Sequence, residues 1–411
     1  MDDIKRRQRI VVVGLNYGSI LSMVRDLGEA GYDIDVLRVF KRKPNPLNLL
    51  GNMKPEKKSK YVGRHEICVM DEDPKRICEA LCDMANPERD SLLIAVDDFL
   101  VSAIDDYYDI LSEHYLISNV EGHKGLNGLM DKNYQKTLAG EFGLPVIESS
   151  LISVDDGDIR IPKDTPFPCF IKPNVSTKGS KLIMKRCDSE EELRSELENK
   201  VMDGSASILA ERFVDIKYEY SILGLSTSDM TLAPCIFRTI LPGHRERKGV
   251  AITGEILDAA DYSDVIDKAE AFVSSTGYVG LFDIDMVEDM EGKIFFTELN
   301  LRSGASIRAF TMSGLDLPAM FAESMFKGST EEPIPLKDIS GKKFVSEKAL
   351  LEEYVRSDIS AKTLDENLKK ADIFFIKDIN DPAPFSYFMK YVRLSHILRI
   401  PYKVRDLLLK K

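Results

Sequence analysis

Residues 282–302 constrain the fold of this chain more than any other stretch, because two alternating apolar and polar runs flank a short polar turn there. The turn ends in Gly292, and this arrangement predicts a β-hairpin. Successive side chains of a strand point to opposite faces, so Asp283 and Asp285 share one face of the first strand. Three polar side chains share a face of the second strand: those of Glu298, Asn300 and Arg302.

If these two polar faces meet, carboxylate oxygens, an amide oxygen and a guanidinium come together. Hard oxygen ligands suit Mg²⁺, which proteins commonly hold with one or two carboxylates and the phosphate oxygens of a ligand. An adjacent arginine can bind a phosphate or carboxylate through two parallel hydrogen bonds. The alternative is an ordinary hairpin with a solvated polar face, and partners elsewhere in the chain must decide between the two.

The chain has 411 residues, enough for two or three domains with their own cores. Its formal net charge of −12 argues against general binding to nucleic acids, which requires a basic surface. No apolar run approaches the roughly 18 residues of a membrane-spanning helix, and the first apolar strand is too short for a signal peptide. The six cysteines lack the paired spacing of a metal site. We therefore expect a cytoplasmic enzyme.

The first part of the chain alternates strand and helix patterns, with strands expected at 9–14, 33–39 and 91–96. This order predicts a layer of parallel strands covered by helices. Gly14 and Gly18 lack the full G-x-G-x-x-G spacing, so a loop that contacts a small substrate is the alternative to a dinucleotide site. Residues 41–63, rich in Lys, Pro and Asn, predict a long surface loop.

The middle of the chain carries a helix start at Asp131-Lys132 and an expected strand at 166–173 that contains Lys172. The polar segment 174–181 follows, before another expected strand at 182–185. A Ser/Thr/Gly loop between strands exposes backbone N–H groups that can wrap phosphates. The spacing is not that of a Walker loop, and a plain hairpin turn is the alternative.

Two further strands are expected at 208–214 and 218–224. A nucleotide base needs backbone donors and acceptors between apolar walls, which the stretch from Glu211 to Val214 can supply. Glu219 can accept hydrogen bonds from ribose hydroxyls. Either glutamate could equally be surface charge.

Taken in order, these segments resemble the ATP-grasp superfamily, specifically its carboxylate–amine ligases and carbamoyl-phosphate-synthetase-like members. The resemblance covers residues 1–328 and includes 313–318 as the closing helix of the family pattern. It implies an α/β fold with a Rossmann-like domain of parallel strands at 1–117, followed by a two-lobed ATP-grasp domain at 118–328. The smaller lobe falls at about 165–214, and residues 329–411 form a C-terminal extension.

The same resemblance implies roles for individual residues. The ATP-binding set is Lys132, Lys172, Ser176, Lys178, Gly179, Ser180, Glu211, Phe213, Val214 and Glu219. The ligands of two Mg²⁺ ions, for which Mn²⁺ is an alternative, are Asp285, Glu298 and Asn300. Arg302 stabilises the transferring phosphoryl group or the acyl-phosphate, with Lys172 as a second catalytic cation. The chain departs from the family pattern at Asp285, where glutamate is common, and in a loop that contains only one glycine.

The substrate is less directly encoded. Arg238 and Arg245 lie in a basic stretch of an acidic protein and could recognise a carboxylate or phosphate, and Arg308 is a further candidate. The alternative is a solvated charged loop. The end of the chain, Lys390–Lys411, carries seven Lys or Arg residues against one Asp. Such a tail is typical of peripheral contact with the inner face of a membrane, and a packed helix or the interface of a homodimer is the alternative.

The resemblance implies an enzyme that uses ATP to join a small-molecule carboxylate to an amine through an acyl-phosphate, acting on an amino acid, a peptide or a cell-envelope precursor. Two alternatives stay open. One is other ATP-grasp chemistry, namely carboxyphosphate formation or phosphoryl transfer without ligation. The other is a nucleotide-binding regulatory module without turnover.

Overall fold

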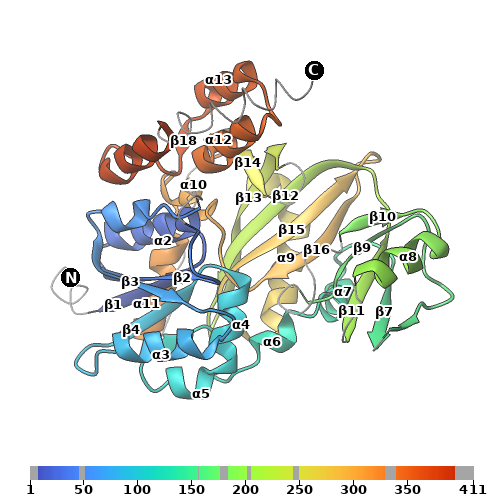
Figure 1. Cartoon of the computed structure of the whole chain (residues 1–411), viewed down its shortest axis with the longest axis horizontal. Coiled ribbons are helices and arrows are strands. Elements are labelled where there is room, and N and C mark those ends of the chain that lie inside the picture. The colour runs from blue at the N-terminus through green and yellow to red at the C-terminus, as the bar shows by residue number, and fades with distance from the viewer. Residues whose placement is uncertain are drawn as a thin grey trace.

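The computed structural model describes residues 8–45, 51–155, 157–175, 184–200, 205–243, 250–328 and 339–393. Within these residues the strands form one parallel and one antiparallel five-stranded sheet and a larger mixed sheet (Figure 1). The mixed α/β class and the N-terminal parallel layer are confirmed. The proposed domain boundaries at residues 117 and 328 remain predictions.

The N-terminal sheet has the strand order β3-β2-β1-β4-β5, and all its strands are parallel. Its strands are β1 (Arg9–Gly14), β2 (Asp33–Phe40), β3 (Val62–Val69), β4 (Ser91–Ala95) and β5 (Leu116–Ile117). Helix α2 (Tyr17–Glu29) packs on one face, and α3 (Lys75–Met84), α4 (Asp98–Asp106) and α5 (Tyr108–Leu111) pack on the other. At Gly14, β1 and α2 come so close that a Cβ would lie 2.4 Å from Ile20 Cγ1.

The small sheet has the order β10-β9-β11-β7-β8 and is antiparallel. Its strands are β7 (Ser149–Asp155), β8 (Asp158–Arg160), β9 (Cys169–Pro173), β10 (Lys185–Cys187) and β11 (Ala206–Arg212). Helix α8 (Glu190–Lys200) buries Leu193 and Leu197 against it. Two helices precede this sheet in the chain, α6 (Leu126–Leu129) and α7 (Lys132–Glu141).

The large sheet has the order β16-β15-β12-β13-β14-β17-β18, with β6 (Asn119–Val120) paired to β15. After β6 in the chain come its strands β12 (Ile216–Ser226), β13 (Thr231–Pro242), β14 (Ala251–Ile256), β15 (Tyr278–Asp289) and β16 (Ile294–Asn300). The short helix η3 (Ala259–Tyr262) and α9 (Ser263–Ser275) pack on one face. The other face meets α2, α10 (Ile307–Thr311) and α11 (Leu317–Lys327), so it joins the N-terminal layer.

The C-terminal segment adds β17 (Lys343–Val345), α12 (Glu347–Arg356), α13 (Ala361–Lys370) and β18 (Ile373–Phe374). Both strands extend the large sheet, and the Phe344 and Phe375 rings stack in its core. Of the predicted basic tail, the structure describes only residues 390–393. Among the described residues, no helix has the length and apolar character needed to cross a membrane.

The prediction that residues 41–63 form a long surface loop is wrong for its second half. There the chain forms the short helix η1 (Pro55–Lys58) and enters β3. Met53 and Glu56 are buried, and η1 packs on α2. The Lys, Pro and Asn content suggested exposure, but the helix α2 and the C-terminal Phe388 cover this segment.

Candidate active site

The hairpin predicted at residues 282–302 is formed by β15 and β16, with Gly292 in the turn at φ +88°. In the antiparallel register Asp285 lies opposite Glu298, and Asp283 lies opposite Asn300. Directly paired residues share a sheet face, so the two polar faces inferred from the alternation are the same face. That face is the one that meets the N-terminal layer.

Arg302 follows β16 and connects the hairpin to the N-terminal sheet. Its Nε lies 3.0 Å from Asp98 Oδ1, at the start of α4 directly after β4. Its Nη2 donates to Asn300 Oδ1 at 3.1 Å, and its Nη1 lies 3.8 Å from Asp283 Oδ2. Burial would lower the pKa of Arg302, but the surrounding carboxylates outweigh it and raise the pKa. Arg302 is therefore held as a cation.

Asp98 was not among the predicted site residues. Its sequence signal was present, because Asp97 and Asp98 follow a buried parallel strand, and ligand sites in such sheets form at the carboxyl ends of the strands. Asp97 accepts a hydrogen bond from the backbone N–H of Leu15, and burial raises the pKa of Asp97 to about 6.

The carboxylates of the hairpin repel one another. Burial, and then the Glu298 carboxylate, raise the pKa of Asp285 to about 6. Burial and Asp285 hold the pKa of Asp283 well above its usual range. Asp283 Oδ1 is buried and has no hydrogen-bond partner among the described residues. Asn300 donates to Asp285 Oδ2 at 3.0 Å, and Ser221 lies 3.2 Å from Asp285 Oδ1.

A divalent cation fits this arrangement, since it would relieve the repulsion between Asp285 and Glu298 and offer a partner to the oxygen of Asp283. Nowhere in the described part of the chain do three His, Cys, Asp or Glu side chains group into a complete metal site. The fit therefore rests on two carboxylates and the Asn300 amide, a donor set that leaves coordination positions for phosphate oxygens and water.

Lysines from two other elements reach the same region. Lys132, at the start of α7, places its Nζ 2.8 Å from Glu298 Oε1. The Nζ of Lys172, on β9, lies 3.0 Å from Glu211 Oε1. The Nζ of Lys136, on α7, lies 2.7 Å from the same oxygen. Burial would raise the pKa of Glu211, but these two lysines outweigh it and lower the pKa. Lys136 was not predicted, since a lysine one turn beyond Lys132 looks like ordinary helix surface.

The start of the predicted phosphate loop is fixed to α7. Asn174 donates to Asp131 Oδ2 at 2.7 Å and accepts from the backbone N–H of Asn133 at 2.9 Å. Asp131 itself caps the helix by accepting from the Tyr134 N–H. Ser176, Lys178, Gly179 and Ser180 lie outside the described residues, as does Arg245.

The predicted nucleotide residues Glu219, Phe213 and Val214 lie near this region. Ser221 pairs with Asp285, so Glu219, two residues earlier on β12, belongs to the same sheet face. Burial raises the pKa of Glu219. Phe213 and Val214 follow β11; the guanidinium carbon of Arg186 lies 4.3 Å from the centre of the Phe213 ring. The nucleotide roles of these residues remain proposals.

The structure does not support a substrate role for Arg238. Arg238 on β13 pairs with Tyr220 on β12, whereas Asp285 pairs with the next residue, Ser221. Adjacent residues of a strand point to opposite faces, so Arg238 lies on the opposite sheet face from Asp285. There it donates to Glu255 at 3.0 Å, and its guanidinium carbon lies 4.6 Å from the centre of the Tyr218 ring. Strand alternation within β13 fixes this face, and the basic composition of the stretch could not reveal it.

Arg308 is also placed away from the substrate region, because its side chain is only 2% exposed. Its two terminal nitrogens bind three carboxylates at 2.7–2.8 Å, those of Asp26, Glu29 and Asp378. These contacts join α10 to α2 and to the C-terminal segment. The prediction that Arg308 reads the substrate is therefore replaced by a structural role.

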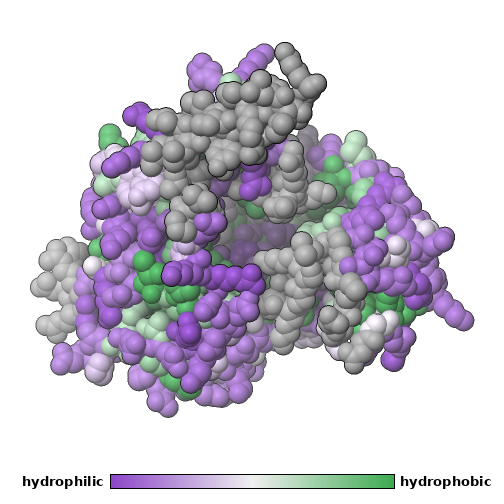
Figure 2. All heavy atoms as spheres, in the orientation of Figure 1, coloured by the Kyte–Doolittle hydropathy of each residue, from purple (hydrophilic) through white to green (hydrophobic). Residues whose placement is uncertain are grey.

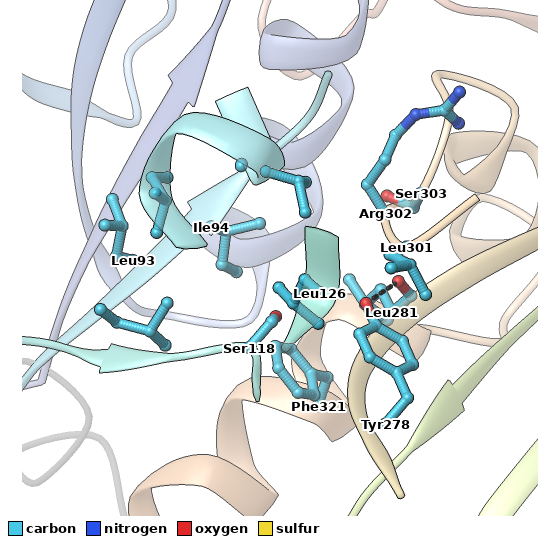
Figure 3. A pocket seen from close by; sticks show the side chains of 14 residues that line it. Leu93, Ile94, Ser118, Leu126, Tyr278, Leu281, Leu301, Arg302, Ser303 and Phe321 are labelled. Carbon is cyan, nitrogen blue, oxygen red and sulfur yellow. Dashed lines mark hydrogen bonds between the residues drawn. The ribbon is translucent and has the colours of Figure 1, made fainter. Parts of the chain in front are cut away.

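A hollow of the surface lies between two parts of the molecule that contribute residues to the candidate site. Figure 2 shows a recessed hydrophilic area at the middle of the molecule, between the N-terminal layer and the small sheet. Beneath Arg302, a cavity lies between β4 and the ends of β15 and β16, lined mainly by apolar side chains (Figure 3). In this view the Arg302 guanidinium extends away from the apolar lining.

No protein-family model matches the sequence. The formate-dependent phosphoribosylglycinamide formyltransferase of Ignicoccus hospitalis is 22% identical over 289 residues, which are 66% of this chain and 68% of that protein. The vancomycin C-type resistance protein VanC1 of Enterococcus gallinarum is 27% identical over 205 residues, 47% of this chain and 57% of that protein. The match to a second such formyltransferase, from Nitratiruptor, spans 24% of its length.

Solved structures share the architecture at low identity. An L-amino acid ligase from Bacillus licheniformis has a TM-score of 0.55 at 14% identity, covering 79% of this chain and 75% of that one. The N5-carboxyaminoimidazole synthetase of Staphylococcus aureus has a TM-score of 0.57 at 15% identity, covering 86% and 87%. The chain therefore shares the fold of these two enzymes, as its resemblance to the ATP-grasp superfamily implied.

Proposed function

We propose that this protein is an ATP-dependent carboxylate–amine ligase that forms an amide bond. The observation that carries the proposal is the convergence of Asp285, Glu298 and Asn300 with Arg302 on one face of the β15–β16 hairpin. Lys132 reaches the same place from α7. Two carboxylates, an amide and two cations together match the needs of phosphoryl transfer, which depends mainly on positioning and on neutralising charge.

The proposed reaction has two steps. A carboxylate is a poor electrophile, so the substrate carboxylate first attacks the γ-phosphate of ATP to give an acyl-phosphate and ADP. The amine then attacks the acyl carbon, and phosphate leaves. Arg302 faces the negative charge that develops on the transferred group, and Asp98 holds the Arg302 guanidinium in place.

The nucleotide would lie between α7, the small sheet and the hairpin. Lys132 and Lys172 would bind its phosphates, with the loop that begins at Asn174 above them. The stretch from Glu211 to Val214 would hold the base and Glu219 the ribose. Because Glu211 already binds Lys136 and Lys172, we assign it the positioning of Lys172.

Asp285, Glu298 and Asn300 would hold Mg²⁺, or Mn²⁺ in its place, and two ions are the expected number. When bound, the metal supplies charge neutralisation for the phosphate oxygens. In its absence Asp285 and Glu298 repel each other, so ATP and metal should bind together.

The similarity to an L-amino acid ligase supports an amino acid as the substrate class. Similarity to N5-carboxyaminoimidazole synthetases supports carboxyphosphate chemistry as the second candidate. A cytoplasmic location, a homodimer and membrane contact by Lys390–Lys411 remain predictions.

The test is ATP-to-ADP conversion with a panel of amino acids, dipeptides and bicarbonate, read as phosphate release and product mass. Ligation predicts ADP formation that depends on a carboxylate and an amine together, with a product lighter by one water than the two substrates. ADP formation with bicarbonate alone would favour the second candidate. Nucleotide binding without turnover on any panel member would favour a regulatory module.

A further inference from the structure

Strand β2 carries a charge where its alternation demands an apolar side chain. Ile34 and Val36 face α2 and are buried in the core beneath it, and Arg38 continues the same face. Arg38 is only 3% exposed. An arginine in an apolar row destabilises the fold unless its charge and donors are matched.

The matching of Arg38 is incomplete. Neither Nε nor Nη1 has a hydrogen-bond partner among the residues that the structure describes, although both are buried. The guanidinium carbon lies 5.1 Å from the centre of the Phe40 ring and 6.0 Å from that of Tyr17. These rings offer a flat surface but no acceptor in the plane of the guanidinium, and a buried donor without an acceptor carries the full cost of its desolvation.

The nearest carboxylates do not supply the missing hydrogen-bond acceptors of Arg38. Glu56 and Asp97 attract Arg38, yet burial still lowers the pKa of Arg38. Glu56 Oε1 lies 3.2 Å from His65 Nε2, and Asp97 accepts from the Leu15 N–H. Lys348 lies over the same Tyr17 ring at 5.1 Å, and its Nζ lies 4.0 Å from Glu352 Oε1.

Arg38 also lies where open parallel sheets bind ligands. It pairs with Gly14 at the carboxyl ends of β1 and β2. There α2 begins, with Asn16 as its cap and no acidic residue in its first turn, so the positive end of a 13-residue helix faces this edge. Leu15, just before the cap, is bonded to Asp97, the neighbour of the residue that holds Arg302.

We propose that Arg38 and the first turn of α2 form an anion subsite that holds a carboxylate or phosphate of the substrate, distinct from the group activated at Arg302. The assignment of this anion to the ligation substrate rests on the proposed function; the presence of the subsite does not. A bound anion would supply in-plane acceptors to Nε and Nη1, the pair of donors that an arginine offers to such groups.

The test is calorimetric titration of inorganic phosphate and, separately, of succinate into the full chain saturated with Mg²⁺ and ADP. The two probes distinguish a phosphate subsite from a carboxylate subsite. Arg38→Gln should weaken binding of the preferred probe by about tenfold or more, the loss expected for charge-assisted hydrogen bonds. Arg38→Lys should keep part of the probe affinity that Arg38→Gln loses. The control variant is Arg64→Gln. Arg64 is an exposed arginine on the neighbouring strand β3 and pairs with Glu66, so this variant should bind the probe as tightly as the unaltered protein does.

Two results would overturn the subsite: no binding of either probe by the unaltered protein, or equal affinity with Arg38→Gln. If Arg38→Gln does not fold, the probe affinity of Arg38→Lys tests the subsite instead. Lysine keeps the positive charge but cannot form the two parallel hydrogen bonds of a guanidinium. Weaker probe binding without any ATP-dependent ligation would reject the proposed function and leave the subsite standing. Ligation whose KM for every substrate is unchanged in Arg38→Gln would reject the subsite and leave the ligase standing.

Discussion

Arg302 and Arg308 are six residues apart, and both contact acidic side chains, yet their surroundings differ. The terminal nitrogens of Arg308 make four hydrogen bonds of 2.7–2.8 Å to carboxylates. Arg302 makes looser contacts, 3.0–3.8 Å from Asp98, Asn300 and Asp283. Its side chain is 19% exposed, against 2% for Arg308.

The difference separates Arg308, which stabilises the fold, from Arg302, which we propose contacts a ligand. Arg308 is bound by residues of α2 and of the C-terminal segment, which lie far apart in the chain. A buried oxygen of Asp283 near Arg302 lacks a partner in the described structure, as does Asp26 Oδ2 near Arg308. Around Arg302, in addition, the carboxylates of Asp285 and Glu298 repel each other. Such unmatched charge is what a metal and a phosphate would complete.

The largest expected effect is on stability at Arg308. Arg308→Gln leaves the carboxylates of Asp26 and Asp378 buried without their cation, which should lower the free energy of unfolding by about 3–5 kcal/mol. Denaturant unfolding measures this. Turnover per folded molecule should change little, and a specific loss of kcat in folded protein would instead restore a role for Arg308 at the substrate.

Arg302→Gln should show the reverse pattern. Loss of a cation aimed at the transferring phosphoryl group should lower kcat by roughly 10²–10³-fold, while the unfolding midpoint changes far less than in Arg308→Gln. Steady-state phosphate release and thermal unfolding on the same preparation give both readings. If the two variants lost stability equally and kept their turnover, the distinction drawn between these arginines would fail.

Lys132→Ala and Lys172→Ala should each weaken ATP binding by roughly 10–100-fold, since under the proposed function each removes a charge that binds the phosphates. Adenosine affinity should fall less, because adenosine lacks phosphates. Calorimetry with both ligands measures the contrast. Lys124→Ala, at an exposed lysine paired with Asp109, is the control and should bind ATP normally; unchanged ATP affinity in both site variants would refute the assignment.

The smallest expected effect is a dependence of Mg²⁺ binding on pH. The pKa of Asp285 is about 6 in the metal-free fold, raised by burial and by Glu298, so protons compete with the metal below pH 6. Affinity should fall about tenfold between pH 7 and pH 5 for one competing proton. Titration of Mg²⁺ across this range measures the fall, and Asp285→Asn should flatten it. Affinity that is independent of pH would show that Asp285 is not a ligand.

The same pKa has a consequence for the metal-free protein. The pKa of Asp285 is higher in the folded state than the ordinary 3.8, so the folded state binds the proton more tightly. The ionisation of Asp285 therefore destabilises the fold at neutral pH, and this destabilisation decreases as the pH falls from above 6 towards 4. Saturating Mg²⁺ should remove this trend.

Local pattern predicted several strands and helices, including β1, β2, β4, the start of α7 and the β15–β16 hairpin. These elements follow from alternation, caps and glycine turns, which act between residues close in sequence. The sequence pattern wrongly predicted a surface loop where η1 forms, and it did not predict β17. Both are short, and both are stabilised by contacts with distant parts of the chain, α2 and β14 respectively.

The sequence by itself determined which residues of β15 and β16 share a face, because strand alternation needs no other information. Only the tertiary structure decided which cations face that site. Arg238 lies on the opposite face because of its register with β12, and Arg308 is bound by acids from both ends of the chain. Arg302 meets Asp98 across 204 residues of sequence. Such pairings depend on how sheets and helices pack, so the residue types alone could not reveal them.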